Sequence, residues 1–291
     1  MEFVFLLEQI VNGLVLGGYY LLVAMGLALI FSVGGVVNLA HGAFYAIGAY
    51  AAYAIGEHAG FFGGILVSPI LVALLGMAFE RTILRRFYDA DPIQGLLVTF
   101  GCAMIVEQLL RIVWGAAPIP VAMPQALKGA VLLGDFLFSR YRLFLLALCA
   151  LVLAGVWWLL HRTAFGRVVR AGIERPDMVA ALGIHIGPYR LAVVALGVGL
   201  AALAGALFAP IATVHPAMGE EILTTAFVVV VIGGLGSFWG VVLAAALVGV
   251  TRGTTIHFVP AAGEAAMYVL MFLVLLLRPR GLLGERIGRF E

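Results

Sequence analysis

Few residues of this chain could carry chemistry, and the densest group of them is Asn38, His41 and Gly42, followed by Gly48. On a helix, positions i, i+3 and i+4 share one face. Asn38, His41 and Gly42 would therefore place an amide, an imidazole and a position without a side chain on that face. The small residues would let another helix or a solute approach closely. Two interpretations stay open: this face lines a solute path, or its polar groups form hydrogen bonds between helices.

A second candidate group is the glycine-rich stretch from Gly233 to Gly240, which contains Gly234, Gly236 and Ser237. It is typical of a tight turn between antiparallel helices, with a close contact through Gly236-x-x-x-Gly240. It is equally typical of a broken helix whose freed backbone faces a cavity. Composition alone does not separate these interpretations.

A third group lies in the most polar part of the chain, from Ala164 to Arg190. Arg175-Pro176-Asp177 reads as a helix start, and a short apolar turn follows until Gly183 stops it. The simplest function is an arginine anchor for two membrane helices, but an exposed apolar turn beside charges usually indicates a partner. The candidate docking residues are Glu174, Arg175, Asp177, Met178, Leu182, Gly183 and Ile184.

Several kinds of chemistry have no residues to support them. Lys128 is the one lysine and no Gly-Lys-Ser/Thr occurs, so the chain has no P-loop for ATP. No Ser-His-Asp order, His-Glu-x-x-His or paired carboxylates occur at membrane depth, so catalysis is not expected. Cys102 and Cys149 give neither a disulfide framework nor metal-ligand spacing. A net charge of +2 excludes a basic nucleic-acid binder, and we expect no cofactor on this chain.

The elements that position these groups must lie in a membrane. Of the 291 residues 64% are hydrophobic and 11% are charged, and the mean hydropathy is +1.15. A soluble domain has about 25% charged residues. Because the first basic residue is Arg81, the amino terminus does not resemble a cleaved signal peptide and is expected to stay as structure.

The sequence predicts one all-α domain over residues 1–291, a polytopic integral membrane bundle of about eight to nine segments, some broken by glycine. A crossing needs roughly 20 mostly apolar residues. The uncharged stretch between Glu221 and Arg252 is too long for one crossing and slightly short for two, so we expect two short helices there. The other expected segments are 10–33, 36–56, 61–79, 93–114, 143–160, 189–211 and 265–277, the last extended backward to 258.

Arginine placement predicts the orientation, since cytoplasmic loops collect Lys and Arg. Most of the 17 basic residues lie in 80–92, 161–190 and 278–291, which should all be cytoplasmic. Three segments before Arg81 then place the amino terminus outside. The connection 115–142 is expected to be an ordered external loop.

With these residues in hand, the chain resembles the inner-membrane permease subunits of branched-chain amino acid ABC importers, specifically the shorter of the two permease types. The resemblance runs nearly end to end. It rests on the order and spacing of Val37–Gly42 with Gly48-Ala49-Tyr50, Glu80-Arg81, Phe165-Gly166-Arg167, Leu182-Gly183-Ile184, Pro216 with Met218-Gly219, Gly233–Ser237, and Arg278-Pro279.

The resemblance implies a multi-pass protein of the bacterial inner membrane, embedded in lipid. Two such permeases would form the pore, two ATP-binding subunits would bind the cytoplasmic loop at about 161–190 and use ATP, and a periplasmic solute-binding protein would deliver the solute. Branched-chain amino acids are the family default, while other amino acids, urea or short amides are alternatives. Glu174-Arg175-Pro176 departs from the family's usual start of the coupling segment.

An ion-driven secondary transporter is a competing class. It would need carboxylates embedded in the membrane or coupling-ion sites in an inverted repeat. No Asp or Glu occurs between Gln9 and Gly56, and Glu107, Glu220, Glu221 and Glu264 lie near segment ends. The sequence therefore favours the importer.

Overall fold

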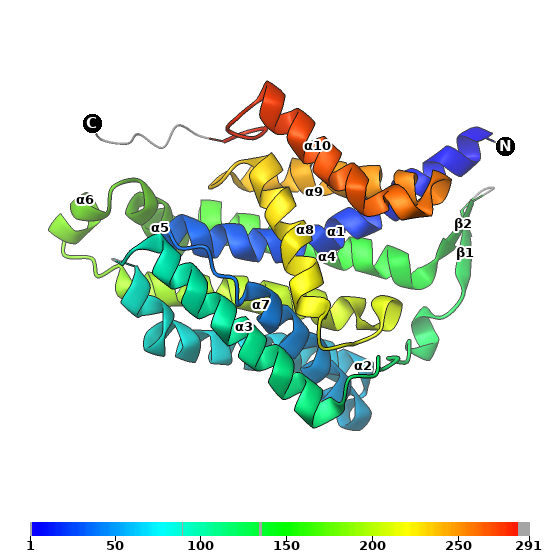
Figure 1. The fold of residues 1–291 in the computed structure, drawn as a ribbon, viewed down its shortest axis with the longest axis horizontal. Helices are drawn as coiled ribbons and strands as arrows, with labels where there is room; N and C mark the ends of the chain where they lie inside the picture. The colour runs from blue at the N-terminus through cyan, green and yellow to red at the C-terminus, as the bar shows by residue number, and fades with distance from the viewer. Residues whose placement is uncertain (1, 89, 134–135, 285–291) are drawn as a thin grey trace.

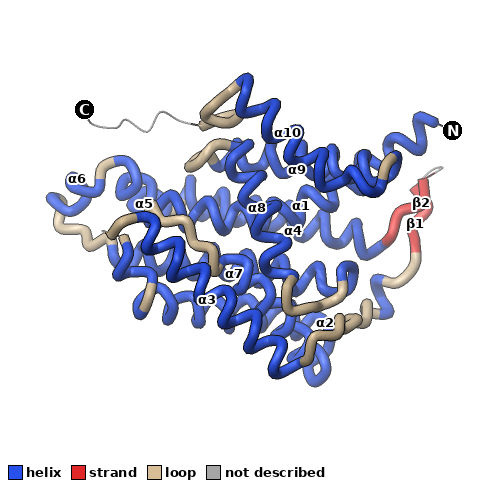
Figure 2. The backbone as a smooth tube through the Cα atoms, viewed as in Figure 1, coloured by secondary structure: helices blue, strands red, loops and turns tan. Residues whose placement is uncertain are grey.

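The computed structural model describes residues 2–88, 90–133 and 136–284, and it is a helical bundle (Figures 1 and 2). Three short 3₁₀ turns, η1 (Leu84–Phe87), η2 (Gln125–Leu127) and η3 (Pro260–Ala262), and one antiparallel hairpin, β1 (Ala130–Leu133) with β2 (Phe136–Ser139), join its helices. The helices are α1 (Glu2–Gly34), α2 (His41–Thr82), α3 (Pro92–Trp114), α4 (Arg140–Arg162), α5 (Ala164–Glu174), α6 (Pro176–Ala181), α7 (Gly187–Ala212), α8 (Met218–Gly233), α9 (Phe238–Phe258) and α10 (Gly263–Leu277).

Within the described ranges, seven helical stretches are long and apolar enough to cross a membrane. They comprise α1, α2, α3, α4, α7, α9 and the stretch Pro260–Leu277. The polytopic helical bundle predicted from the sequence is confirmed.

Helix α2 is a folded-back pair of helices rather than one crossing. Its 42 residues would extend about 63 Å if straight, roughly twice the hydrocarbon thickness. Gly60 has φ 73° and ψ 170°, which glycine adopts without a steric penalty. A Cβ on Gly64 would lie 2.5 Å from the Ala52 carbonyl oxygen, which is possible only if the two arms lie side by side. The arms correspond to the predicted segments 36–56 and 61–79, and Figure 1 shows them as neighbouring passes.

The break expected between Glu221 and Arg252 is also present. Helix α8 has 16 residues and runs steeply across the other helices, and after the turn 234–237 α9 continues for 21 residues (Figure 1). With the arms of α2 counted separately and α8 included, the described residues form nine apolar segments, the upper end of the expected range.

Close packing between small residues holds the bundle together. Lipid tails are as apolar as leucine side chains, so helices in a membrane associate by packing rather than by escape from water. A Cβ on Gly17 would lie 2.7 Å from the Ala245 carbonyl oxygen, and one on Gly249 would lie 2.4 Å from the Gly17 nitrogen. The Gly13-x-x-x-Gly17 and Ala245-x-x-x-Gly249 patterns therefore face each other across α1 and α9.

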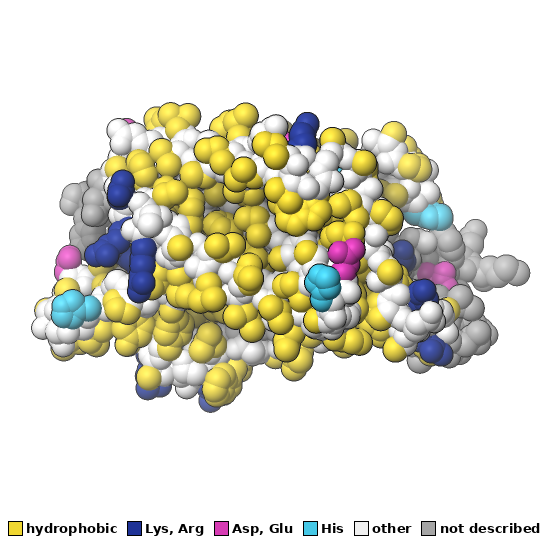
Figure 3. Space-filling model, turned by 90° about the horizontal axis from the view of Figure 1, so that it is seen from below, with side chains coloured by type: hydrophobic (Ala, Val, Ile, Leu, Met, Phe, Trp, Pro, Cys, Tyr) yellow, Lys and Arg dark blue, Asp and Glu magenta, His cyan; other side chains and the backbone are white. Residues whose placement is uncertain are grey.

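Burial orders the helices from centre to periphery. In the most apolar stretch of α1 and of α7, 67% of the residues are buried, against 11% in α3. Hydrophobic side chains dominate the face in Figure 3, with most Lys and Arg side chains toward its two ends. This distribution suits a belt of lipid around α3 and its neighbours.

The described residues of the connection between α3 and α4 include η2 and the two strands of the β-hairpin. Ile119 and Val214 exchange backbone hydrogen bonds of 2.8 and 2.9 Å, so this loop is tied to the segment before α8. It lies at the end of the bundle opposite the arginine-rich loops (Figure 1).

We predict that Gly17→Leu disrupts the packing of α1 against α9. The new side chain has no room beside the Ala245 backbone, and overpacking typically costs about 1–3 kcal/mol. The yield and melting temperature of detergent-solubilised protein should both fall. Gly155→Leu is the matched control, because a Cβ there meets nothing within 4 Å; equal losses in both variants would contradict the packing argument.

Candidate functional site

The first predicted group lies at the start of α2, and one part of its expected geometry is wrong. Residues 35–40 are not helical, and α2 begins at His41 rather than near Val36. Asn38 therefore does not share a helical face with His41. Its side-chain oxygen accepts a hydrogen bond from the Ala40 nitrogen (3.0 Å), an alternative to helix that Asn side chains offer the backbone.

His41 connects α2 to α1. Its Nε2 lies 3.0 Å from the Val23 carbonyl oxygen, and because a carbonyl only accepts, Nε2 carries the hydrogen and donates it. The His41 and Asn38 side chains are both fully buried. This contact is the hydrogen bond between helices that the sequence left open as one interpretation.

Gly42 brings α2 against α8. A Cβ on Gly42 would lie 2.0 Å from the Gly219 carbonyl oxygen, and one on Gly219 would lie 2.6 Å from the Gly42 carbonyl oxygen. Gly48 similarly packs on Ala202 of α7, where a Cβ would lie 2.4 Å from the Ala202 Cα. The two sequence motifs around Gly42 and Gly219 therefore meet backbone to backbone, and we call this contact the motif junction.

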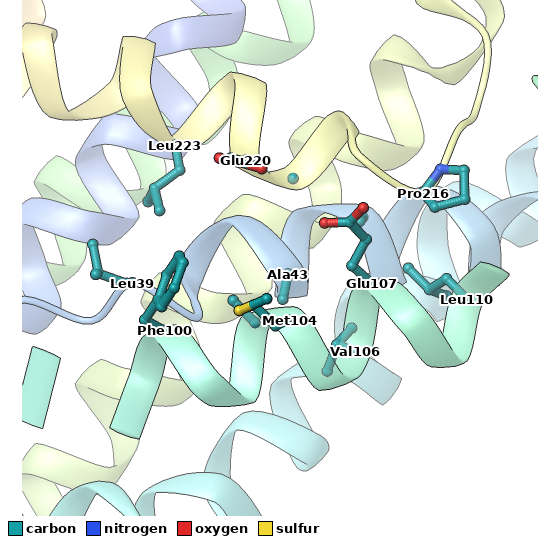
Figure 4. Close-up of a pocket in the computed structure, with 13 residues that line it drawn as sticks. Leu39, Ala43, Phe100, Met104, Val106, Glu107, Leu110, Pro216, Glu220 and Leu223 are labelled. Atoms are coloured by element: carbon teal, nitrogen blue, oxygen red, sulfur yellow. The ribbon is translucent and has the colours of Figure 1, made fainter. Parts of the chain in front are cut away.

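A narrow cavity of about 50 Å³ lies beside the motif junction (Figure 4). Its walls come from α2, α3 and α8, and Glu107 reaches from α3 toward the α8 side, where Glu220 lies. Arg111 pairs with Glu107 at 2.8 Å, one helical turn away on α3. The cavity is much smaller than the roughly 300–1,000 Å³ of typical ligand pockets.

The glycine-rich break contains the expected turn, but its close contact joins Gly233 to Gly240, where a Cβ on Gly240 would lie 2.1 Å from the Gly233 carbonyl oxygen. The contact expected through Gly236 is wrong, because a Cβ there would meet nothing within 4 Å. Gly234 packs in a turn, where a Cβ would lie 2.6 Å from the Gly284 Cα. Gly236 and Ser237 instead line a cavity of about 340 Å³, which Ser32 of α1 and Glu174 of α5 also line. The Ser237 hydroxyl accepts a hydrogen bond from the Gly240 nitrogen (3.1 Å) and thereby caps α9.

The third predicted group forms α5, α6 and the loop after them. Met178 and Leu182 are exposed by 58% and 77%, and one helical turn separates them. Val179, however, is buried, and Ile184 is half-buried, so the exposed apolar face is smaller than expected. Glu174, Arg175 and Asp177 surround it and are exposed, and Gly183 (φ 76°) ends the turn.

A polar cluster holds the loop between α2 and α3 against the start of α7. The Tyr88 hydroxyl donates to a carboxylate oxygen of the buried Glu80 (3.3 Å), and the Arg190 guanidinium lies 5.0 Å from the Tyr88 ring centre. Burial, together with the Glu80 carboxylate, raises the pKa of the Tyr88 phenol. The Glu80 motif thus joins the end of α2 to the start of α7.

Sequence reasoning missed a polar-lined cavity of about 390 Å³ beside α8. This Arg252 cavity is bounded by α1, α2, α7, α8, α9 and α10. Arg252 donates to the Tyr20 hydroxyl (2.6 Å) and lies 3.7 Å from a Glu264 oxygen, and His215 Nε2 lies 3.6 Å from a Glu221 oxygen. Glu221 and Arg252, the two charges at the ends of an uncharged stretch, were the signal for it, but their spacing alone did not indicate that both line one cavity.

Comparison with known proteins places the chain in a family. Residues 9–278 match the model described as branched-chain amino acid transport system / permease component. The high-affinity branched-chain amino acid permease protein BraD of Pseudomonas aeruginosa is 27% identical, with 96% of each chain covered. The permease protein LivH of Escherichia coli is 24% identical, with 98% of this chain and 97% of LivH covered.

Two further similarities concern a second permease type and the fold. The permease protein LivM of Escherichia coli is 30% identical, with 91% of this chain and 67% of LivM covered. A chain of the solved structure of PsaBC from Streptococcus pneumoniae in complex with Fab has a TM-score of 0.50 at 12% identity, covering 91% and 89% of the two chains, which shows a shared fold. Because the family model spans nearly the whole chain, this multi-pass membrane protein belongs to the family of branched-chain amino acid transport permease components.

Proposed function

We propose that this chain is a permease subunit of an ATP-binding cassette importer that carries branched-chain amino acids across the bacterial inner membrane. The observation that carries the proposal is the family match over residues 9–278. The names of BraD and LivH, both matched almost end to end, support the substrate class.

The distribution of arginines favours an orientation in which the arginine-rich loops face the cytoplasm. Arg81, Arg85 and Arg86 lie in or beside η1, Arg167 and Arg170 lie in α5, and Arg278 and Arg280 follow α10. These three segments lie toward one end of the bundle (Figure 1). Cytoplasmic loops collect such residues. The amino terminus lies at the opposite end (Figure 1), which agrees with an odd number of passes and an external start.

The partners are a second, related permease, two ATP-binding subunits and a periplasmic solute-binding protein. The similarity to both LivH and LivM supports pairing with a related permease. The absence of a P-loop in the sequence supports separate ATP-binding subunits, with this chain as the transport subunit. The exposed Met178 and Leu182, surrounded by charges, fit a helix-in-groove contact with such a subunit.

The motif junction forms a wall of the solute path. His41 and Gly42 hold α2 against α1 and α8, Asn38 shapes the turn before α2, and Gly48 seats α2 on α7. Gly236 and Ser237 face the cavity at the arginine-rich end, and Gly234 fixes the turn behind them. In this arrangement, most of these residues shape the wall rather than contact the solute.

We predict that uptake requires the complete complex. Proteoliposomes with this chain, a related permease, the ATP-binding subunits and a leucine-loaded binding protein should accumulate labelled leucine when ATP is present, and ionophores should not abolish uptake. This chain alone should be inactive because it has no nucleotide site. Uptake by the chain alone, or uptake that collapses with an ion gradient, would contradict the proposal.

We predict that Leu182→Asp uncouples ATP hydrolysis from uptake. A buried, unpaired carboxylate in an apolar contact is costly, so the ATP-binding subunits should dock weakly and uptake per ATP should fall. Ala180→Asp is the matched control, because Ala180 is also exposed but lies on the opposite side of α6. Normal coupling in the Leu182 variant would remove the docking role.

We predict that Gly42→Leu lowers the yield of assembled complex, because no side chain fits against the Gly219 backbone. His41→Gln should assemble nearly normally, since its amide can still donate to the Val23 carbonyl. Gly101→Leu is the control, because a Cβ there meets nothing within 4 Å. Complex yield by size-exclusion chromatography is measured beside uptake. Normal assembly with lost uptake for Gly42→Leu would instead mean that this glycine contacts the solute.

A further inference from the structure

The Arg252 cavity carries an inference that rests on the proposed function and goes beyond it. At about 390 Å³ it has the size of a small-molecule pocket. Its lining includes both signs of charge, several hydroxyl groups and aliphatic side chains. The lining therefore has groups for both the charged and the apolar parts of a small molecule.

The cation of the cavity is only partly satisfied within the chain. The Arg252 guanidinium has five N–H donors. Among the described residues, its polar contacts are the 2.6 Å hydrogen bond to Tyr20 and the 3.7 Å ion pair with Glu264. That ion pair is long beside the roughly 2.7–2.9 Å of a charge-assisted hydrogen bond. A fixed guanidinium with free donors is suited to a carboxylate.

Two carboxylates face the same space and are more accessible than the arginine. The side chains of Glu221 and Glu264 are 69% and 78% exposed, whereas that of Arg252 is 23% exposed. Glu221 has a 3.6 Å contact with His215, again longer than a strong hydrogen bond. Both carboxylates can therefore accept an ammonium group.

The remaining lining is apolar or aromatic. Leu16, Ile222, Ile256 and Met267 come from four different helices, and Phe208 stacks on Tyr19 at a ring-centre distance of 3.6 Å. The Tyr19 and Tyr45 hydroxyls bond to each other at 2.6 Å, so these two groups are already satisfied. This part of the lining suits an aliphatic side chain.

We propose that the Arg252 cavity binds a zwitterionic amino acid with an aliphatic side chain. Arg252 receives the α-carboxylate, Glu221 and Glu264 receive the α-ammonium group, and the side chain rests among Ile222, Ile256 and Met267. The cavity lies beside the start of α8 and is a binding site within the membrane domain. It is distinct from the narrow cavity at the motif junction.

The test measures ligand protection of a cysteine placed in the cavity. Thr224→Cys, and Ala212→Cys as a second reporter, are introduced with Cys102 and Cys149 replaced by alanine, because both positions line the cavity and neither has a role in the proposed binding. The assembled permease complex, without binding protein or ATP, is treated with a small methanethiosulfonate reagent, and modification is followed by mass spectrometry of the labelled peptide. Ala117→Cys, on the exposed loop at the same end, reports non-specific effects.

Leucine should slow modification of the cavity cysteines but not of the cysteine at position 117. Isoamylamine, which lacks the carboxylate, and 4-methylpentanoate, which lacks the amine, should protect much less. Arg252→Gln should raise the leucine concentration for half-protection by about tenfold, as expected for losing a charged hydrogen-bonded contact. Arg111→Gln is the matched control, since it removes an exposed arginine at the same end of the bundle.

Leucine uptake by each reporter complex separates this inference from the proposed function. Normal uptake without protection at either cysteine, or protection unchanged by Arg252→Gln, would overturn the binding site and leave the importer intact. Failure of the wild-type complex to take up any branched-chain amino acid, with protection by a solute of another class, would overturn both.

Discussion

The structure depends on contact between the backbones of glycine residues. Helices in lipid gain little by burying apolar side chains against each other, so their stability comes from short distances. The contacts of Gly42 with Gly219, of Gly17 with Gly249, and of Gly26 with Gly197 tie α1 to α7 and α9, and α2 to α8. A leucine at any of these positions would push two helices apart. The cavities on the two sides of α8 exist because these contacts fix where α8 lies.

Helix α8 separates two environments with adjacent residues. Glu220 lines the narrow cavity toward α3, while Glu221 lines the Arg252 cavity toward α9 and α10. The opposite face of α8 is buried, and Ala226 and Val229 on it are fully inaccessible to solvent. A helix of this kind can be polar toward two spaces and still be held firmly by its apolar side. Its steep angle to the other helices, seen in Figure 1, places its start near the middle of the bundle.

Much of the fold could be predicted because hydropathy is a local property. The segments, the two arms within residues 41–82 and the break after Gly233 all follow from stretches of sequence read one at a time. Asn38 was misplaced because apolar neighbours favoured helix, whereas its side chain bonds to the Ala40 nitrogen. The Arg252 cavity was not predictable, since Tyr20, Glu221, Arg252 and Glu264 come from four helices whose packing no local pattern specifies.

The turn after α8 also bears on the order in which the protein is made. The last carbonyl groups of a helix have no partner within that helix. Here the Ile232 and Gly233 carbonyls accept hydrogen bonds from the Leu282 and Leu283 nitrogens, at 2.7 and 3.2 Å. Since domains are synthesised from the amino terminus, α8 leaves the ribosome before the residues that complete it exist. Its carboxyl end therefore acquires these two hydrogen bonds only after α9, α10 and the segment that follows them have been synthesised.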